Sequence, residues 1–265
     1  MFRKMQSSLA RPSVLAASLA TGMLFTGFAG TAMAATDPPT KTDPPAKTVE
    51  IKTIDLHTWK LDPATGWSVR KLVGKKVKGP KGENVGEVDN IVFGPDGKVR
   101  QLIVSTGGFL GFGEKNLAVK WSDVTVAPDY GFVTTPITAE SVKKYGLFDG
   151  IPKSSGPLAE RDWRSSELIG DYVYLKGNVH YAYVRDLIVS QGGELQAVIV
   201  SPDVSFSHAD GLYAGGYYAY PFYGYGYGYG HGYGHGHGWN PGNAHYNLPY
   251  DKTDIAELLP YAYRK

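Results

Sequence analysis

Hydrophobic and polar residues follow the same pattern in two separate stretches of the chain. The stretch "VDNIVFGPDGKVRQLIVS" covers residues 88–105, and "VRDLIVSQGGELQAVIVS" covers residues 184–201. Each contains two β-rich runs, split by "GPDG" in the first and by "QGGE" in the second. Glycine allows the positive φ of a tight turn at little steric cost. Each stretch is therefore predicted to form a β-hairpin.

The two hairpins belong to a longer internal duplication. The sequence "WSVRKLVGKKVK" at 67–78 aligns with "WRSSELIGDYVY" at 163–174 at an offset of 96 residues, and the hairpins align at the same offset. Self-similarity at a fixed offset indicates a repeated structural unit. We expect two modules, residues 67–148 and 163–265, each closing its own interior, with residues 149–162 as the linker between them.

Further elements complete each module. Residues 116–121, "NLAVKW", are predicted to form another strand. A short closing helix is expected within residues 138–148, with Thr138 as its N-cap and Gly146 at its end. Short strands, tight turns and little helix favour an all-β fold of two small antiparallel barrels or sandwiches in tandem.

The beginning of the chain has the pattern of an export signal. Its first 34 residues combine a basic start, an apolar run at 14–28 and the small-x-small motif Ala32-Met33-Ala34. This is typical of a cleaved signal peptide, so the mature protein is expected to start near Ala35 in the periplasm or outside the cell. The apolar run is short for a membrane span, so no stable span is expected after cleavage.

Residues 35–66 are predicted to be a linker, because "TDPPTKTDPPAK" at 36–47 repeats a proline-rich hexad that favours an extended spacer. The chain has no cysteine. Disulfides, thiolate metal ligands and the lipid-bearing cysteine of a lipoprotein are thereby excluded.

Charge argues against a nucleic-acid partner. The chain has 27 basic and 25 acidic residues, and three of the basic ones lie in residues 1–34, which contain no acidic residue. After cleavage 24 basic residues face 25 acidic ones, so the mature chain has a net charge near −1. Binding to phosphates needs clustered Lys and Arg. The one dense basic run, residues 70–81, is predicted to be a solvated sheet face.

A glycine-rich tract interrupts the second module. Residues 211–238 contain 11 Gly, 9 Tyr and 3 His, inside an insertion of about residues 206–245. Such a segment buries no aliphatic side chain and is costly to order, so it is predicted to be a disordered loop. Alternation along an extended chain would place aromatic rings on one side as an interaction surface, with self-association as an open alternative. The candidate interaction residues are Tyr225, Tyr227, Tyr229 and Tyr233.

The same tract could hold a metal ion. Imidazoles bind Zn²⁺, Ni²⁺ and Cu²⁺, and His208 and Asp210 lie at the entrance of the loop. A flexible His-rich tract also binds such ions without any selected role, so an interaction loop is the preferred interpretation and no cofactor is expected. The candidate ligands are His231, His235, His237 and His245.

Catalytic motifs are missing from the sequence, and no enzyme activity is expected. Asp89 and Asp186 occupy equivalent places, each before an apolar run, and this equivalence suggests an acid pair. A carboxylate there more often accepts backbone N–H bonds. The tryptophans Trp67, Trp121 and Trp163 are predicted to pack in the core or at a barrel rim.

Residues 67 to about 126 resemble a PRC-barrel domain of the exported bacterial type. The resemblance depends on Leu72-Val73-Gly74, on Gly82-Glu83 and on the turn "GGFLGFGEK". The second module resembles the family more weakly: it lacks that turn, and its residues 248–250 were aligned with 119–121. The turn residues concerned are Gly107, Gly108, Gly111, Gly113, Glu114 and Lys115.

The resemblance implies a six-stranded β-barrel that docks to larger assemblies through a sheet face or a loop. We therefore expect a non-catalytic periplasmic binding or scaffolding protein whose partner is an envelope protein or surface. The alternative is a periplasmic transition-metal-binding protein that uses the His-rich loop.

Overall fold

The structure is a computed structural model of the 265-residue chain. It describes residues 53–62, 65–106, 116–138, 140–142, 161–203, 216–225, 237–256 and 258–263. All of them belong to one compact unit, which spans Ala46–Lys265. The predicted signal peptide, residues 149–160 of the predicted linker, the "GGFLGFGEK" turn and the middle of the glycine-rich tract lie outside the described residues.

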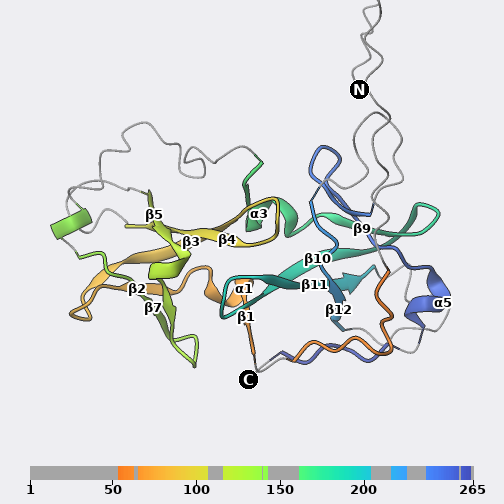
Figure 1. Cartoon of the computed structure of the whole chain (residues 1–265), viewed down its shortest axis with the longest axis horizontal. Helices are drawn as coiled ribbons and strands as arrows, with labels where there is room; N and C mark the ends of the chain where they lie inside the picture. The colour runs from red at the N-terminus through yellow and green to blue at the C-terminus, as the bar shows by residue number, and fades with distance from the viewer. Residues whose placement is uncertain are drawn as a thin grey trace, which may run out of the picture. The chain divides into compact units, whose positions relative to one another are not determined.

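The first half of the chain (residues 65–142) contributes a curved sheet with the strand order β5-β4-β3-β2-β7-β6 (Figure 1). Strand β2 pairs antiparallel with β3 and parallel with β7. The bounds are β2 Lys76–Lys78, β3 Asn84–Phe93, β4 Val99–Ser105, β5 Asn116–Lys120, β6 Thr125–Val126 and β7 Phe132–Thr134. The 3-10 helix η2, Trp121–Asp123, connects β5 to β6.

The second half (residues 161–256) contributes a sheet with the matching order β12-β11-β10-β9-β14-β13. Here β9 pairs antiparallel with β10 and parallel with β14. The bounds are β9 Tyr172–Leu175, β10 Val179–Ser190, β11 Leu195–Pro202, β12 Tyr218–Pro221, β13 Gly238–Asn240 and β14 His245–Asn247, followed by the helix α5 at Lys252–Ile255.

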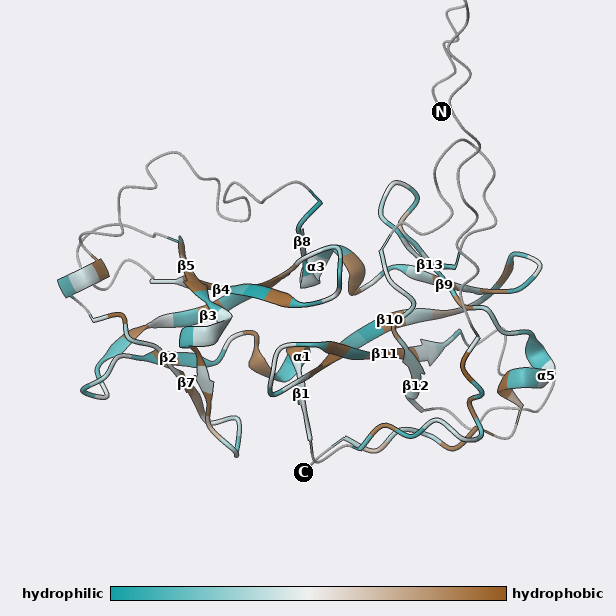
Figure 2. Ribbon diagram, viewed as in Figure 1, coloured by the Kyte–Doolittle hydropathy of each residue, from teal (hydrophilic) through white to brown (hydrophobic). Residues whose placement is uncertain are grey.

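The prediction of an all-β, barrel-like fold is confirmed. Both predicted hairpins form, as β3–β4 and β10–β11. Thr138 also caps a helical turn, since its hydroxyl accepts a hydrogen bond from the Ser141 N–H at 3.0 Å. Each sheet includes one parallel pair, which the expectation of purely antiparallel barrels did not foresee. Figure 2 shows the strands as mixed hydrophobic and hydrophilic ribbons, as expected for sheets with one buried face.

Strand register shows which residues of the two halves are equivalent. Lys76 pairs with Glu87 in the first half, and Tyr172 pairs with Tyr183 in the second, an offset of 96 for both partners. At the far edge, Val198 pairs with Tyr220 where the first half pairs Leu102 with Val119. Strand β12 therefore takes the place of β5. The alignment of residues 248–250 with 119–121 is wrong.

The glycine-rich insertion is thus only partly a loop. Its described parts form β12 and β13, and the side chains of Tyr218, Tyr220, Tyr223 and Trp239 are buried. Tyr218 and Tyr220 alternate with Ala219 along β12, so both rings face the core. The prediction of a loop through about residues 206–245 is wrong for these segments. Residues 204–215 and 226–236 lie outside the described residues.

The first strand of each half belongs to the sheet of the other half. Strand β1, Gly66–Ser68, pairs with β10, and β8, Trp163–Arg164, pairs with β3. Each strand leads into a single helical turn, α1 at Val69–Leu72 and α3 at Ser165–Leu168. The prediction that each module closes its own interior is therefore wrong: the halves exchange their first strands reciprocally.

The two hairpin turns meet where the halves are related by pseudo-twofold symmetry. The Val99 N–H donates to the Gly193 carbonyl at 2.7 Å, and the Leu195 N–H donates to the Gly97 carbonyl at 2.9 Å. These two bonds are equivalent, because each residue is 96 positions from its counterpart. Between them Lys98 forms a β-bridge with Glu194, its own equivalent. Reciprocal contacts of this kind are the mark of a twofold interface.

The hydrophobic core extends through both halves as one cluster. Trp163 stacks on Phe93 with ring centroids 4.5 Å apart, and its indole N–H donates to the Gly94 carbonyl at 3.1 Å. Trp67 contacts Tyr130 edge-on at 5.1 Å. The prediction that Trp67 and Trp163 pack in the core is confirmed, and each lies on the strand that pairs with the opposite half.

The described part of the predicted N-terminal linker is folded onto the second half. Leu56 is buried, and the Ile54 N–H donates to the Tyr223 hydroxyl at 3.1 Å. The Tyr250 hydroxyl donates to the Ile54 carbonyl at 2.7 Å. A second small core, Ile188 with Ala197 and Ile199, lies beneath this segment and the C-terminal one. Residues 53–62 are therefore no free spacer. Figure 1 shows the two segments running side by side.

No helix among the described residues is long and apolar enough to cross a membrane.

Candidate functional site

A cluster of aromatic rings covers the outer face of β9, β10 and β14. Ring centroids of neighbouring members lie 4.5 to 6.5 Å apart, so the rings form one continuous surface. The alternate residues Val173, Leu175 and Tyr246 point into the core. We call this surface the aromatic face; it consists of Tyr172, Tyr174, His180, Tyr183 and His245.

A β-bulge assembles this face. His180 and Tyr183 are three positions apart, so regular alternation would place them on opposite sides of the sheet. The register of β10 against β9 shifts between His180 and Ala182. Because the bulge absorbs one residue, His180 lies opposite Tyr174 and Tyr183 lies opposite Tyr172, on the same face.

The members of the face differ in exposure and in polar contacts. Tyr172 is 44% exposed, more than any other tyrosine among the described residues. The other four members of the face are half-buried. The Nε2 atom of His180 is buried and has no hydrogen-bond partner. At the border of the face, the Arg185 guanidinium lies 5.4 Å from the centroid of the Tyr183 ring. A buried imidazole nitrogen without a partner is costly, which makes it a natural point for ligand contact.

The first half supplies a comparison at the equivalent positions. Equivalence follows from register: Lys76 pairs with Glu87, Lys78 with Asn84, and Lys76 also with Phe132. Four of these five residues are charged or amidic, as predicted for a solvated face, and the Lys78 amine lies 4.0 Å from the centroid of the Phe132 ring. The same place in the same fold is thus mostly polar in one half, where Phe132 is the one aromatic residue of the five, and wholly aromatic in the other. The fold alone does not require aromatic residues there.

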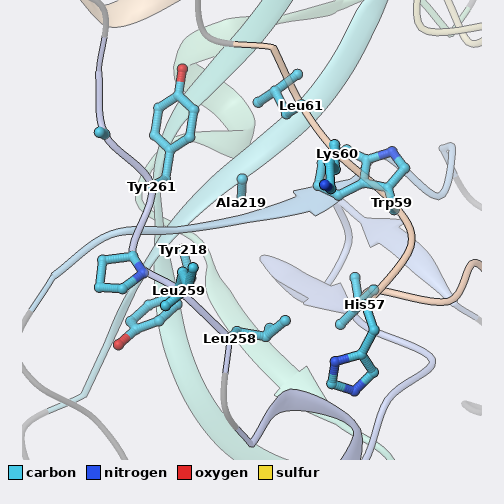
Figure 3. A pocket seen from close by; sticks show the side chains of 12 residues that line it. His57, Trp59, Lys60, Leu61, Tyr218, Ala219, Leu258, Leu259 and Tyr261 are labelled. Atoms are coloured by element: carbon cyan, nitrogen blue, oxygen red, sulfur yellow. The ribbon is translucent and has the colours of Figure 1, made fainter.

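A groove of about 460 Å³ lies on another side of the second half, between residues 56–61 and 258–262 (Figure 3). Its floor includes Tyr218 and Ala219 of β12, and Figure 3 shows Tyr261 and His57 at opposite ends. Leu259 on its rim is 87% exposed. We call it the terminal groove, because segments from both ends of the described chain form its walls. Lys60 is the only permanently charged side chain that lines it.

The candidate acid Asp186 takes part in the contact between the two halves. Asp186 is buried, and it accepts hydrogen bonds from the Ser68 hydroxyl at 2.5 Å and the Arg70 N–H at 2.9 Å. Burial raises the pKa of its carboxyl, although these bonds oppose the shift. Its equivalent in the first half is Asn90, not Asp89, and Asn90 accepts from the Ser165 hydroxyl at 2.8 Å. Asp186 and Asn90 thus each accept hydrogen bonds from the start of the helical turn of the opposite half. The prediction of a structural carboxylate at Asp186 is confirmed.

The predicted metal ligands are only partly described. His231 and His235 lie outside the described residues. His245 belongs to the aromatic face, with its ring 4.5 Å from Tyr174. His237 has a lowered pKa because of burial and the nearby Lys176 charge. Among the described residues, no three His, Asp or Glu side chains lie close enough together to hold a metal ion.

The predicted interaction residues are divided in the same way. Tyr225 forms a β-bridge with Trp239, with their rings 5.3 Å apart, so it packs against the sheet. Tyr227, Tyr229 and Tyr233 lie outside the described residues, as do all six residues of the predicted turn motif. The aromatic face was missed from the sequence. Its signal was the alternation of Tyr172 and Tyr174 at positions where the first copy has lysine.

Fold and surface together define a mostly β protein, built of two barrel-like sheets, with a cluster of aromatic rings on the outer face of one of them. Residues 66–139 match the family model of the PRC-barrel domain. The chain therefore contains a PRC-barrel domain, and the matched range includes β1, which pairs with the opposite half. The comparison with curated proteins found no match.

Proposed function

We propose that the chain is a non-catalytic binding and scaffolding protein of the bacterial cell envelope that docks through the aromatic face. A PRC-barrel domain is compatible with a non-catalytic scaffolding or interaction role. The export signal predicted from residues 1–34 supports an envelope location. The observation that carries the proposal is the contrast between five aromatic residues in the second half and a set of four charged or amidic residues and one phenylalanine at the same sheet positions in the first half.

The proposal includes a second PRC-type half. The common strand order and the common registers support an origin of both halves from one module. Exchange of β1 and β8 joins them into one body, so a ligand bound to the second half is rigidly connected to the first. A scaffold needs such a connection, because a binding surface on a free tether does not fix the position of what it holds.

Co-sedimentation of the purified full chain with washed bacterial envelope fractions tests the proposal. The informative variant is Tyr172→Lys with Tyr174→Lys, which introduces the residues of the first half, where the same fold accepts them. We expect the wild type to sediment with the envelope and the double variant to remain in the supernatant. Equal sedimentation of both proteins would overturn docking through this face.

Leu259→Lys is the control, because it adds one positive charge at the terminal groove, half of what the double variant adds, and leaves the aromatic face intact. It should sediment like the wild type. If Leu259→Lys abolishes sedimentation and the double variant does not, the docking site is the terminal groove instead.

A further inference from the structure

The chemistry of the aromatic face specifies the class of ligand. Each of its five rings has an apolar face and a polar group at its edge, either a phenol hydroxyl or an imidazole nitrogen. None of the five is aliphatic. Such rings suit a partner that is itself apolar on one side and polar at its edges. The pyranose ring of a sugar has this character, with C–H bonds on its faces and hydroxyl groups around its rim.

We propose that the aromatic face binds a linear glycan whose pyranose rings stack on Tyr172 and Tyr174. This inference rests on the proposed function and names the ligand of the same surface. The face lies on a sheet, across three neighbouring strands, so an extended chain can cross several rings in succession. Aromatic stacking needs no deep pocket, since each ring offers a flat surface of its own.

His180 provides the polar contact that orders such a chain. The His180 ring lies among the rings of Tyr172, Tyr174 and Tyr183 at centroid distances of 5.4 to 5.5 Å. Its buried Nε2 atom has no hydrogen-bond partner, so a sugar hydroxyl contacts this nitrogen once a covering side chain moves aside. A sugar hydroxyl can either donate or accept, so it satisfies this nitrogen in either tautomer. A bulky aliphatic side chain of a protein partner would leave the nitrogen unsatisfied.

Arg185 extends the site at its border. Its guanidinium lies 5.4 Å from the centroid of the Tyr183 ring and the residue is exposed, so its N–H donors are within reach of a ligand that covers the face. Acetamido oxygens and carboxylates accept hydrogen bonds from such donors. An N-acetylated glycan therefore fits better than an unsubstituted one.

Two probes test the inference with the full chain: protein-free peptidoglycan sacculi in a co-sedimentation assay, and soluble tetramers of β-1,4-linked N-acetylglucosamine and of β-1,4-linked glucose in titration calorimetry. We expect binding to the sacculi and to the acetylated tetramer, with the glucose tetramer bound more weakly. The double variant Tyr172→Lys, Tyr174→Lys should bind at least about tenfold more weakly, and Leu259→Lys should bind like the wild type.

His180→Phe separates the hydrogen bond from the ring. Phenylalanine preserves the stacking surface and removes Nε2, so binding should weaken while the melting temperature is preserved or rises. Binding of His180→Phe equal to that of the wild type would show that the nitrogen contacts no sugar, and would overturn the oriented site described above. Tyr172→Ser, at the most exposed ring, gives the same stacking test with a milder change.

Failure of this inference is distinguishable from failure of the proposed function. If the wild type sediments with envelope fractions and the double variant does not, but neither sacculi nor tetramers are bound, the face binds a different ligand and the glycan is overturned. If the wild type binds sacculi but neither tetramer, the result for the double variant decides. Loss of sacculus binding in the double variant supports the glycan inference, and unchanged sacculus binding overturns it. Binding to all probes by the double variant would overturn both proposals.

Discussion

The hydroxyl of Ser68 donates a hydrogen bond of 2.5 Å to the carboxylate of Asp186, 118 positions further along the chain. Ser68 also caps α1, because its oxygen accepts from the Lys71 N–H at 3.1 Å. One buried carboxylate of the second half thus anchors the start of the first half. A similar contact in the opposite direction joins the hydroxyl of Ser165, which is the counterpart of Val69 and not of Ser68, to the amide oxygen of Asn90 at 2.8 Å. A buried side-chain hydrogen bond therefore stabilises each of the two exchanged segments.

Asp186→Asn tests the effect of a buried charge at the Ser68–Asp186 contact. Burial raises the pKa of Asp186, so the folded protein holds the proton more tightly than the unfolded chain, whose carboxyl has its ordinary pKa of 3.8. Stability is therefore lost as pH rises from about 4 through the raised pKa, and it is not regained at neutral pH. Asparagine carries no charge, and Asn90 shows that an amide fits this position.

The expected result is that Asp186→Asn is more stable than the wild type at pH 7 and that the difference shrinks toward pH 4. Each unit of raised pKa corresponds to about 1.4 kcal/mol. Urea denaturation from pH 4 to pH 8 measures this. A variant that is less stable than the wild type by the same amount at every pH would show that the hydrogen bonds outweigh the buried charge.

Gly193→Ala tests the contact between the two hairpin turns. Gly193 has φ +83°, and an added Cβ would lie 2.6 Å from the indole ring of Trp121 in the first half. The variant combines left-handed strain with displacement of that ring. Gly177→Ala is the matched control, because Gly177 has φ +77° but nothing within 4 Å of the added atom.

We expect Gly177→Ala to cost about 1 to 2 kcal/mol from backbone strain alone. Gly193→Ala should cost more, and it should change the fluorescence of Trp121 as well. Chemical denaturation followed by tryptophan emission measures both effects. Equal losses for the two variants would contradict a close contact between the halves at this turn.

Tyr223 and Tyr250 fasten the N-terminal segment to the second half. Their hydroxyls are hydrogen-bonded to each other, and both contact the backbone of Ile54. Burial and the Tyr223 hydroxyl raise the pKa of Tyr250, so this phenol stays protonated over the usual pH range. Removing one hydroxyl leaves polar groups of the other tyrosine and of Ile54 poorly satisfied.

Tyr223→Phe and Tyr250→Phe should each reduce the free energy of unfolding by about 1 to 3 kcal/mol. The double variant should lose less than the sum of the two, because the bond between the hydroxyls is counted twice. Cleavage by a protease within residues 53–62 should accelerate in each variant. Strict additivity, or no change in cleavage, would show that the hydroxyls do not hold the segment.

The glycine-rich tract includes a buried tyrosine of β12 and further rings that lie outside the described residues. Tyr220 is fully buried in β12, and Tyr220→Ala should cost about 3 to 5 kcal/mol, as for other large aromatic side chains. The sequence predicts a disordered loop for residues 226–236, so replacing the rings there by serine should change the free energy of unfolding by less than about 0.5 kcal/mol. The tract must keep its length, because Tyr225 and Trp239 pair in parallel and need a connection between them. The substituted residues are Tyr227, Tyr229, His231, Tyr233 and His235.

The same serine variant tests the metal alternative. If His231, His235, His237 and His245 form a site, the wild type binds Zn²⁺, Ni²⁺ or Cu²⁺ stoichiometrically and the variant does not. Burial favours the neutral form of His237, which is the form that ligates a metal. His245 is held at 4.5 Å from Tyr174, so its participation requires this ring contact to break. Stoichiometric binding that survives in the serine variant would exclude His231 and His235 as its ligands.

The sequence by itself determined the local elements. The two hairpins, their glycine turns, the cap at Thr138 and the 96-residue repeat follow from short-range patterns, because turn geometry and side-chain alternation act over a few residues. Buried tryptophans at 67 and 163 followed from their apolar bulk. The carboxylate of Asp186 was correctly assigned a structural role, although its hydrogen-bond partner from the opposite half could not be read from the chain.

Only the tertiary structure decided which strands pair over long distances. Gly66 lies beside Ser190, and Trp163 beside Phe93, because an exchanged first strand has the same local sequence as one that stays in its own sheet. The tyrosines of β12 could fill the place of aliphatic residues in β5 only once the sheet was formed. The aromatic face likewise needs a bulge at residues 180–182 and a parallel neighbour, β14, that comes from more than 60 residues further along the chain. Such contacts depend on packing between distant segments, which no pattern within a single segment encodes.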